Sequence, residues 1–210
     1  MMKISGGLSE KGVVIGNTFD KYQSGNPVVR KLMSGFESSL VSLLDHANPL
    51  TIHEVGCGEG YWVMRWLEQG LNARGSDFSS TVIELAINNA VERNLPEGVF
   101  KQRSIYDLRP ESDSAELIVC CEVLEHLEQP EDALRVLQTL TQKYVIFSVP
   151  REPLWSMMNM ARGKYWSDFG NTPGHIQRWS KRSFIAVVSK YFDVVQVRTP
   201  VPWTMLLCSA

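Results

Sequence analysis

Apolar positions along most of the chain alternate between a spacing typical of strands and one typical of helices. Segments that read as strands occur at residues 50–55, 72–78, 98–105, 115–124 and 143–150. Helical spacing occurs between them, at residues 61–70, 80–95 and 130–140. Strands that alternate with helices of this length are typical of a parallel sheet with helices on both faces. The pattern therefore predicts an α/β fold with a doubly wound sheet.

The carboxyl-terminal part departs from this alternation. A helical pattern at residues 180–192 is followed by two extended runs, 193–201 and 203–210, with only Pro202 between them. Such a short connection permits a hairpin and excludes a helical crossover, so the two strands should be antiparallel to each other. We expect a seven-stranded sheet, mostly parallel, with one antiparallel strand in this terminal hairpin.

Composition supports one ordinary globular domain. The chain of 210 residues is 44% hydrophobic and 21% charged, which excludes a disordered protein and a small disulfide scaffold. The formal net charge of -2 argues against a protein that lies along a nucleic-acid duplex, because such proteins carry an excess of basic groups.

The cysteines and the apolar runs also bear on location. Cys57, Cys120, Cys121 and Cys208 show no CxxC spacing, so we interpret them as small buried hydrophobes in a reducing compartment. The start of the chain lacks the apolar stretch of a secretory signal, and no run approaches the ~20 apolar residues that a membrane span needs. We expect a cytoplasmic protein without membrane insertion.

A glycine-rich turn follows the first predicted strand of the sheet. The sequence Glu-Val-Gly-Cys-Gly-Glu-Gly at residues 54–60 connects that strand to a helix, where backbone N–H groups are free to meet a ligand. A dinucleotide fingerprint would place its third glycine at position 61, which is Tyr61. The spacing instead places the Glu54 carboxylate at the strand end, where it can meet a ligand ammonium. The alternative is a glycine-rich connection that binds nothing.

An acidic residue follows the second predicted strand. Asp77 stands 21 residues after Gly56 and can accept hydrogen bonds from both hydroxyls of a ribose, with Phe78 beside an adenine. The alternative is that Asp77 supports the start of the helix at Ser79 and Ser80. The glycine turn nearby favours the ligand interpretation.

Residues 50–210 resemble the class I S-adenosylmethionine-dependent methyltransferases. The resemblance rests on IHEVGCGEGYW, ARGSDFSSTVIELA, FKQRSIYDL, LIVCCEVLEHLEQPEDAL and YVIFSVP. It implies a Rossmann-like fold, S-adenosylmethionine as cofactor and methyltransferase activity, with Ser104 standing where the family often has an acid. Glu54 and the glycine turn would hold the methionine part, Asp77 the ribose, and Phe78 and Ile105 the adenine faces. The full set of expected cofactor-binding residues is Tyr22, Glu54, Gly56, Cys57, Gly58, Gly60, Asp77, Phe78, Ser104, Ile105, Cys121 and Glu122.

Two segments outside the strand and helix alternation are free to shape the site. Residues 1–49 read as an irregular leader plus a helix from Pro27, and we expect them to cover the cofactor site. Residues 50–210 form the methyltransferase domain, in which residues 151–179 lack a clear period and are rich in Trp and Met. So many large apolar groups should cover something, either as a lid and substrate pocket or by packing at the sheet edge or at a dimer contact.

The fourth-strand motif carries candidate reaction chemistry. Glu122, Glu125 and His126 form E-x-x-E-H, and a helical turn would bring all three to one face. With His175 they would suit Mg²⁺ or Mn²⁺. The motif resembles both small-RNA 3′-terminal 2′-O-methyltransferases and ubiquinone-pathway O-methyltransferases. The alternative is a metal-free site in which the glutamates cap a helix and the histidine faces the substrate.

These residues predict methyl transfer to an oxygen, and with less weight to a nitrogen, of a small-molecule acceptor. His126, His175 and Glu122 are the expected catalytic residues, because a hydroxyl needs a base or a metal before it attacks. Methylation of an RNA 3′-terminal ribose is the first alternative, and a cofactor-binding module without catalysis is the second. The sequence makes no prediction of oligomeric state.

Overall fold

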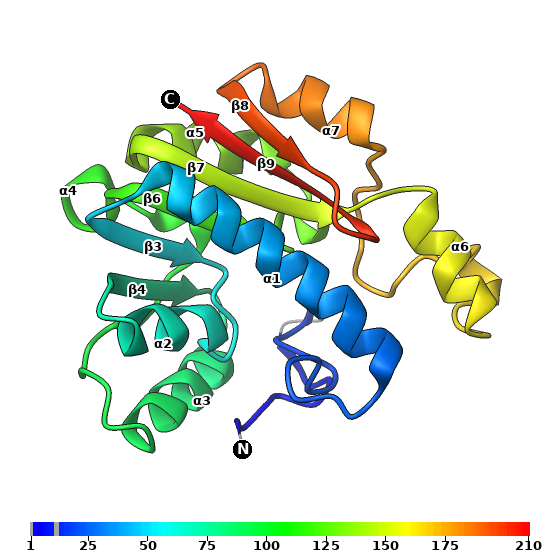
Figure 1. Cartoon of the computed structure of the whole chain (residues 1–210), viewed down its shortest axis with the longest axis horizontal. Coiled ribbons are helices and arrows are strands. Elements are labelled where there is room, and N and C mark those ends of the chain that lie inside the picture. The colour runs from blue at the N-terminus through cyan, green and yellow to red at the C-terminus, as the bar shows by residue number, and fades with distance from the viewer. Residues whose placement is uncertain (1, 11–12) are drawn as a thin grey trace.

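A seven-stranded sheet forms the centre of the molecule in the computed structural model, which describes residues 2–10 and 13–210 (Figure 1). Its strand order is β5-β4-β3-β6-β7-β9-β8, and a separate two-stranded hairpin, β1-β2, lies in the leader. The strands are β1 (Ser9–Glu10), β2 (Val13–Val14), β3 (Thr51–Val55), β4 (Asn72–Asp77), β5 (Phe100–Gln102), β6 (Ala115–Cys121), β7 (Thr141–Pro150), β8 (Asp193–Arg198) and β9 (Trp203–Ser209).

The strand directions confirm the predicted fold class. Strand β3 is parallel to both β4 and β6, and β6 is parallel to β7. Strand β9 is antiparallel to β7 on one side and to β8 on the other. The short connection at residues 199–202 forces the chain to turn back, so β9 is the antiparallel strand of the terminal hairpin.

Helices cover both faces of the sheet, as a doubly wound fold requires. One apolar core packs α1 and α2 on one face, through side chains such as Phe36 and Met64, and the other packs α5 and α7 through Leu137 and Phe184. The α-helices are α1 (Pro27–Ala47), α2 (Tyr61–Glu68), α3 (Ser80–Val91), α4 (Pro110–Asp113), α5 (Pro130–Leu140), α6 (Leu154–Ala161) and α7 (Lys181–Val188). The 3₁₀ turns are η1 (Ile105–Asp107), η2 (Leu124–His126) and η3 (Trp166–Asp168).

Helix α1 begins and ends where its sequence predicts. The Asn26 side chain accepts hydrogen bonds from the backbone N–H groups of Val28 and Val29, and Pro27 occupies the first turn, where its missing N–H costs nothing. Asn48 takes a left-handed conformation with φ 41° and ends the helix. The helix lies across the face of the sheet near β3 and β9 (Figure 1).

Helix α6 lies in the segment where the sequence shows no period. Its buried positions are polar, because Ser156 and Asn159 are the residues that face inward. The Ser156 hydroxyl donates to Glu152 Oε1 (2.8 Å), and the Asn159 side-chain amide donates to the Gly170 carbonyl (2.8 Å). The two buried positions of this helix are therefore polar, and the apolar pattern alone could not reveal it.

Two expected strands are shorter than predicted, and both end beside the site. The run at 98–105 forms a strand only at Phe100–Gln102, and Ile105 lies in the η1 turn instead. The run at 115–124 stops at Cys121, because Glu122 takes a left-handed backbone with φ 59°.

All four cysteines are free, and three of them are buried. This agrees with their interpretation as packing residues, and a cytoplasmic location stays a prediction.

Among the described residues, none of the helices has both the length and the apolar character needed to cross a membrane.

Candidate active site

The predicted ligand-binding residues gather at the carboxyl ends of β3, β4 and β6. Glu54 is the residue before the last of β3, Asp77 is the last residue of β4, and Glu122 follows β6 directly. These three strands are neighbours in the sheet and parallel, so their ends meet at one edge. This is the edge at which open α/β sheets bind their ligands.

Three glycines of the turn after β3 have positive φ, for different reasons. A Cβ on Gly56 would lie 2.2 Å from the Val123 side chain, and one on Gly60 would lie 2.5 Å from Phe100, so both are required by packing. A Cβ on Gly58 (φ 53°) would have no described atom within 4 Å. The backbone at Gly58 therefore faces open space, which suits the close approach of a ligand.

Asp77 ties the glycine turn to β4. Its Oδ2 accepts a hydrogen bond from the Gly58 N–H (3.1 Å), and its Oδ1 accepts one from the Ser79 N–H (3.1 Å). Ser79 itself caps α3 by accepting from the Val82 N–H, so the start of that helix does not depend on Asp77. Burial raises the pKa of Asp77. Each oxygen retains a lone pair for a further donor, such as a ribose hydroxyl.

Glu54 is a buried carboxylate, and one of its oxygens makes no hydrogen bond to the described residues. Only 4% of the residue is exposed, and its Oε2 has no hydrogen-bond partner within the described part of the chain. Burial raises the pKa of Glu54 well above its ordinary value, because the charged form has lost its water. A ligand ammonium at this oxygen would satisfy it, so the residues present fit the methionine end of S-adenosylmethionine.

The residues expected beside the adenine differ in their solvent exposure. Ile105 is buried and Phe78 is exposed. The Ser104 hydroxyl accepts from the Tyr106 N–H (3.4 Å) and begins the η1 turn, a local role that accounts for a serine at this position. The thiols of Cys57 and Cys121 lie at the same sheet edge, and burial raises the pKa of both well above the ordinary value. They remain protonated at neutral pH and act as packing groups.

The leader reaches the site through Tyr22. Its ring stacks on Tyr61 with centroids 3.5 Å apart and an interplanar angle of 7°, and it meets Trp62 edge-on at 5.7 Å. Both partners belong to the first turn of α2, directly after the glycine turn. Burial, and next the charge of Glu54, raise the pKa of Tyr22 well above its ordinary value.

Glu59, which the sequence does not single out, anchors the leader inside the glycine turn. Its Oε1 accepts from the backbone N–H groups of Ser5 (3.0 Å) and Asn17 (2.8 Å), and its Oε2 accepts from the Asn17 side-chain amide (2.6 Å). A Cβ on Gly16 (φ 57°) would lie 2.3 Å from Oε1, so only glycine fits there. The partners of Glu59 are 54 and 42 positions away, beyond any local motif.

Replacing Glu59 with alanine is expected to release the leader and to lower the free energy of unfolding by about 2–3 kcal/mol, since hydrogen bonds to a charged group are lost. Burial opposes ionisation of Glu59, but its hydrogen bonds to Ser5 and Asn17 outweigh burial and lower its pKa. This stabilisation is therefore present above the ordinary glutamate pKa and is lost as pH falls through the lowered value.

Hydrogen exchange at the Ser5 and Asn17 amides checks this prediction. The control is Glu92→Gln, which removes an exposed ion pair between Lys3 of the same leader and α3's C-cap residue. Exposed pairs contribute little, so the control should leave the two amides protected. Equal protection in Glu59→Ala and the wild type would contradict the anchoring role.

The E-x-x-E-H segment does not bring all its side chains together. Glu122 has a left-handed backbone, which interrupts the helical turn on which the expected convergence depended. Its Oε1 accepts from the Ser148 hydroxyl (2.9 Å) and its Oε2 accepts from the Trp203 indole N–H (2.6 Å). Of the four residues expected to bind a metal, the structure gathers Glu125, His126 and His175, and metal binding stays a prediction.

Candidate ligand atoms of these three residues all lie within 4.8 Å of one another. Both oxygens of the buried Glu125 are without a hydrogen-bond partner among the described residues. His126 Nδ1 lies 2.9 Å from the Gly174 carbonyl oxygen, which assigns a proton to Nδ1 and leaves the Nε2 lone pair free. The ring centroids of His126 and His175 are 4.9 Å apart.

Burial sets the protonation of this cluster. It lowers the pKa of His126, and burial together with the neighbouring His126 lowers the pKa of His175 to about 3. Both rings are therefore neutral at neutral pH. Burial, followed by the charge of Glu122, raises the pKa of Glu125 well above its ordinary value. An unpaired carboxylate beside two neutral imidazoles can accept a proton or hold a divalent cation.

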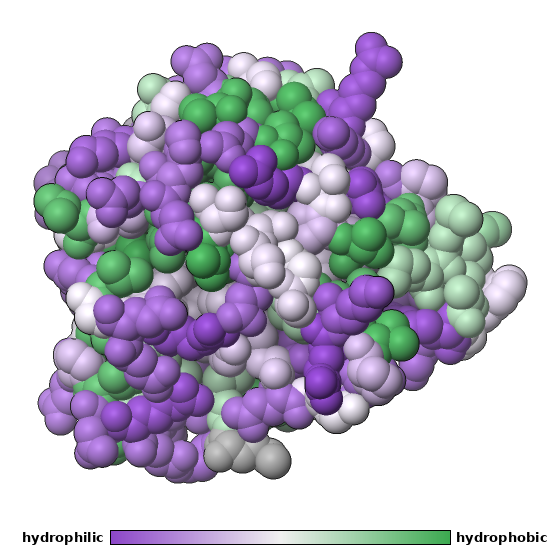
Figure 2. Space-filling view, viewed as in Figure 1, coloured by the Kyte–Doolittle hydropathy of each residue, from purple (hydrophilic) through white to green (hydrophobic). Residues whose placement is uncertain are grey.

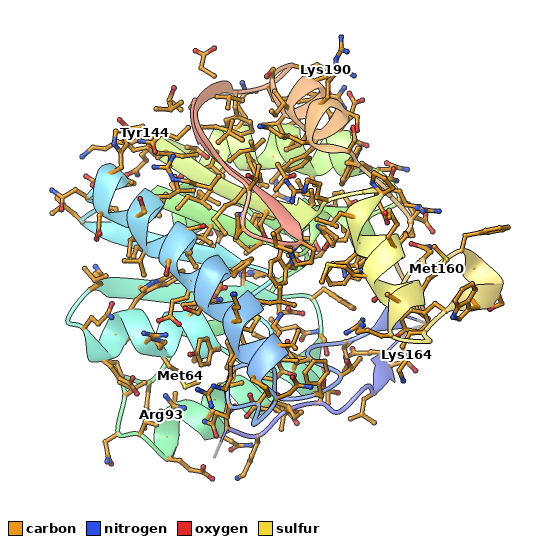
Figure 3. All side chains as sticks on the ribbon, turned by 45° about the vertical axis from the view of Figure 1, so that its right-hand side comes forward. Met64, Arg93, Tyr144, Met160, Lys164 and Lys190 are labelled. Atoms are coloured by element: carbon orange, nitrogen blue, oxygen red, sulfur yellow. The ribbon has the colours of Figure 1, made fainter. Side chains whose placement is uncertain are left out.

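The segment 151–179 divides into an inner and an outer part. The Trp155 indole N–H donates to Thr172 Oγ1 (2.8 Å), and its ring lies 5.9 Å from that of His175, so Trp155 borders the cluster. Trp166 and Phe169 are 66% and 77% exposed. Helix α6 projects beyond the sheet, with Met160 in its last turn and Lys164 shortly after it (Figure 3). Apolar side chains gather on this part of the surface (Figure 2).

Comparison with known proteins agrees with this geometry. Residues 32–197 match the family model described as a methyltransferase domain. The ubiquinone biosynthesis O-methyltransferase of Pasteurella multocida (strain Pm70) is 30% identical over 118 residues, which are 50% of this chain and 49% of that protein. The chain spans about half the length of the curated relatives it matches.

Solved structures share the fold. Magnesium protoporphyrin IX methyltransferase from Synechocystis PCC 6803, with bound SAH, is similar with a TM-score of 0.68 and 19% identity, over 90% of each chain. The methyltransferase domain of bacterial CtHen1-CN is similar with a TM-score of 0.64 and 22% identity, over 85% of this chain and 100% of that domain. The family match covers most of the chain, and the sheet order and the glycine turn agree with it. The chain belongs to the methyltransferase domain family, and it has the fold of the class I S-adenosylmethionine-dependent methyltransferases.

Proposed function

We propose that this protein transfers the methyl group of S-adenosylmethionine to a hydroxyl oxygen of a small-molecule acceptor. The observation that carries the proposal is the cluster of Glu125, His126 and His175, which places two neutral imidazoles and an unpaired carboxylate together beyond β6. Hydroxyl acceptors need such groups, because a hydroxyl is a poor nucleophile until its proton is removed. An amine acceptor needs less help.

The cofactor-side residues would act by positioning. When bound, S-adenosylmethionine supplies a methyl group that is already activated for in-line displacement by its positive sulfur. Glu54 would pair with the ligand ammonium, Asp77 would accept the ribose hydroxyls, and the Gly58 backbone would allow close approach. Good alignment of two reactants can supply about 7–11 kcal/mol of a barrier, so positioning accounts for much of the catalysis that the protein must provide.

His126 is the better placed of the two histidines to act as general base. The Gly174 carbonyl oxygen holds its Nδ1–H, so the free Nε2 can take the acceptor proton while the acceptor oxygen bonds to the methyl carbon and the carbon–sulfur bond breaks. His175, with a pKa of about 3, accepts a proton much less readily at neutral pH. Its place between Trp155 and His126 suits a positioning role.

A divalent cation is the second route by which the same three residues would act. Glu125, His126 and His175 would hold Mg²⁺ or Mn²⁺, and such a cation would lower the pKa of the acceptor hydroxyl. Glu122 lies outside this group of three, and its two oxygens accept hydrogen bonds from Ser148 and Trp203. Activity after treatment with a chelator, and its restoration by Mg²⁺ or Mn²⁺, separates this route from a metal-free base.

The test is methyl transfer by the wild type and by His126→Ala, with a panel of phenols, catechols and primary amines as acceptors. Loss of a general base is expected to lower kcat on hydroxyl acceptors by about 10²–10⁴-fold. The dissociation constant of S-adenosylmethionine should not change. The control is His46→Ala, which removes an exposed histidine from the last turn of α1. Full activity of His126→Ala would overturn the base assignment, and methylation of amines alone would overturn the oxygen assignment.

An RNA 3′-terminal ribose is the second candidate acceptor. Two observations favour it: the Glu125, His126 and His175 cluster, and the similar fold of the small RNA methyltransferase HEN1. The net charge of -2 weighs against it. Binding of a short single-stranded RNA decides the matter, because affinity for a phosphate backbone falls steeply with salt, whereas affinity for a small metabolite changes little.

A further inference from the structure

Lys21 is a positive charge that the leader places beside the cofactor site. Its Nζ lies 5.3 Å from the centroid of the Tyr22 ring, and that ring stacks on Tyr61 in the first turn of α2. The Asp20 Oδ1 accepts hydrogen bonds from the Tyr22 N–H (3.1 Å) and the Gln23 N–H (2.9 Å), which fixes the turn that carries Lys21. The ammonium is therefore held next to the aromatic side chains that follow the glycine turn.

The Lys21 side chain has no acidic partner in the structure. It is half-buried, and within residues 2–10 and 13–210 its ammonium forms no ion pair with a carboxylate. The contact with the Tyr22 ring attracts the cation only weakly. A half-buried ammonium without an anion is incompletely satisfied, so it is free to pair with a negatively charged ligand.

The charge of Lys21 reaches the carboxylates of the site. Burial raises the pKa of Glu54, Glu122 and Glu125, and the positive charge of Lys21 opposes that rise in all three. Burial, and next the charge of Glu54, raise the pKa of Tyr22, whose ring Lys21 contacts. Because such effects fall off with distance, Lys21 lies on the side of the site where Glu54 would meet the ligand ammonium.

The methionine end of S-adenosylmethionine carries an ammonium and a carboxylate on the same carbon atom. Glu54 accounts for the ammonium alone. The acidic side chains that gather at this edge of the sheet, Glu54, Asp77 and Glu122, would repel a carboxylate. Lys21 is a nearby side chain of the opposite charge.

We propose that Lys21 binds the carboxylate of S-adenosylmethionine while Glu54 binds its ammonium. The two side chains would then recognise the two charges of the amino acid group separately. The leader, which carries Lys21, would supply a ligand-binding residue in addition to covering the site. This role rests on S-adenosylmethionine as the cofactor of the proposed function, and not on the identity of the acceptor, because it concerns binding alone.

Binding of S-adenosylmethionine and of its decarboxylated analogue, measured by titration calorimetry on the full chain, tests this role. The analogue keeps the ammonium and the positive sulfur and lacks only the carboxylate. Lys21→Met should weaken S-adenosylmethionine binding by about tenfold to a hundredfold, because a hydrogen bond between charged groups is lost. It should not weaken binding of the analogue. Lys21→Arg keeps the charge and should retain most of the preference for the carboxylated ligand.

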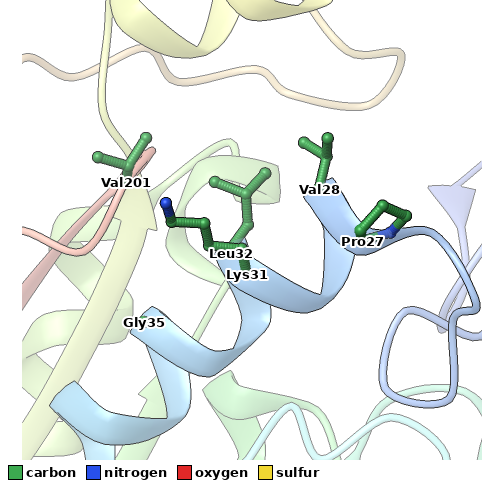
Figure 4. A pocket seen from close by; sticks show the side chains of 6 residues that line it. All are labelled: Pro27, Val28, Lys31, Leu32, Gly35 and Val201. Carbon is green, nitrogen blue, oxygen red and sulfur yellow. The ribbon is translucent and has the colours of Figure 1, made fainter.

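Two control variants accompany this measurement. Glu54→Gln should weaken the binding of both ligands by a similar factor, since both carry the ammonium. Lys31→Met removes an exposed lysine of α1, which borders an open hollow between this helix and Val201 (Figure 4). This variant should change neither affinity.

The ratio of the two affinities decides the outcome. An equal loss for both ligands in Lys21→Met would overturn the proposal, since the residue would then only support the fold of the leader. An unchanged preference for the carboxylated ligand would overturn it in favour of the backbone N–H groups at the start of α2. With that preference unchanged, a loss of kcat/KM confined to hydroxybenzoates, relative to neutral phenols, would assign Lys21 to an acidic acceptor instead. The expected binding pattern, in a protein that methylates no hydroxyl, would contradict the proposed function and support the role of Lys21.

Discussion

Replacing Glu54 with glutamine is expected to weaken S-adenosylmethionine binding by about two to three orders of magnitude and to stabilise the ligand-free protein. Removing one partner of a buried ion pair costs about 3–5 kcal/mol, which sets the loss of affinity. Without ligand the Glu54 Oε2 has no partner among the described residues, so neutralising the group removes an unfavourable buried charge. Calorimetric titration with the cofactor and thermal unfolding without it measure the two effects.

The gain in stability should depend on pH in a defined direction. Because burial raises the pKa of Glu54 in the folded protein, its contribution to stability is fully present below the ordinary glutamate pKa and is lost as pH rises through the raised value. The stability difference between Glu54→Gln and the wild type should therefore grow with pH. The exposed Glu84 supplies the control, as Glu84→Gln should change neither quantity. Unaltered cofactor affinity in Glu54→Gln would show that this carboxylate does not meet the ammonium.

Replacing Gly58 with alanine is expected to reduce cofactor affinity by about tenfold to a hundredfold. The new methyl group would project into the open space where the ligand must approach the backbone, and overpacking of this kind costs about 1–3 kcal/mol. Calorimetric titration gives the affinity. A left-handed alanine also destabilises the fold by roughly 1–2 kcal/mol, so the effect of strain has to be separated from the effect on binding.

The variant Gly98→Ala separates the effect of backbone strain from the effect on cofactor binding. Gly98 also has a left-handed backbone, with φ 74°, and a Cβ there would likewise have no described atom within 4 Å. It lies in the loop before β5, away from the glycine turn. Both variants should lose similar stability, and only Gly58→Ala should lose affinity. Equal affinity losses in the two variants would assign the effect to strain and remove Gly58 from the cofactor site.

Much of the fold could be predicted from the sequence because its central strands β6, β7 and β9 are rich in apolar residues and its turns carry distinctive residues. The run from Leu117 to Cys120 is buried throughout, so the strand is visible without a period. Pro202 between two extended runs was sufficient to predict the terminal hairpin. Helix α6 was not predicted because its inward positions are Ser156 and Asn159, and their burial depends on hydrogen bonds that an apolar pattern does not reveal.

The candidate site, like the fold, could be predicted from the sequence only in part. The positions of Glu54 and Asp77 could be predicted because both residues stand at the carboxyl ends of predicted strands, and these ends meet at one edge of a parallel sheet. That Glu122 lies outside the cluster of Glu125, His126 and His175 could not be predicted, since it depends on a left-handed backbone at a non-glycine residue, which the spacing E-x-x-E-H does not reveal. The role of Glu59 could not be predicted because its partners Ser5 and Asn17 are far away in the sequence and come beside the turn only when the leader folds.

The Glu59 carboxylate joins two parts of the molecule that the chain separates by some forty residues. Since Glu59 stands between Gly58 and Gly60, we expect the order of the leader and the affinity of the turn for its ligand to be thermodynamically linked. Linkage is reciprocal for binding free energies, so contacts that order the leader should raise the affinity of the turn for its ligand, and a bound ligand should stabilise the ordered leader by the same free energy.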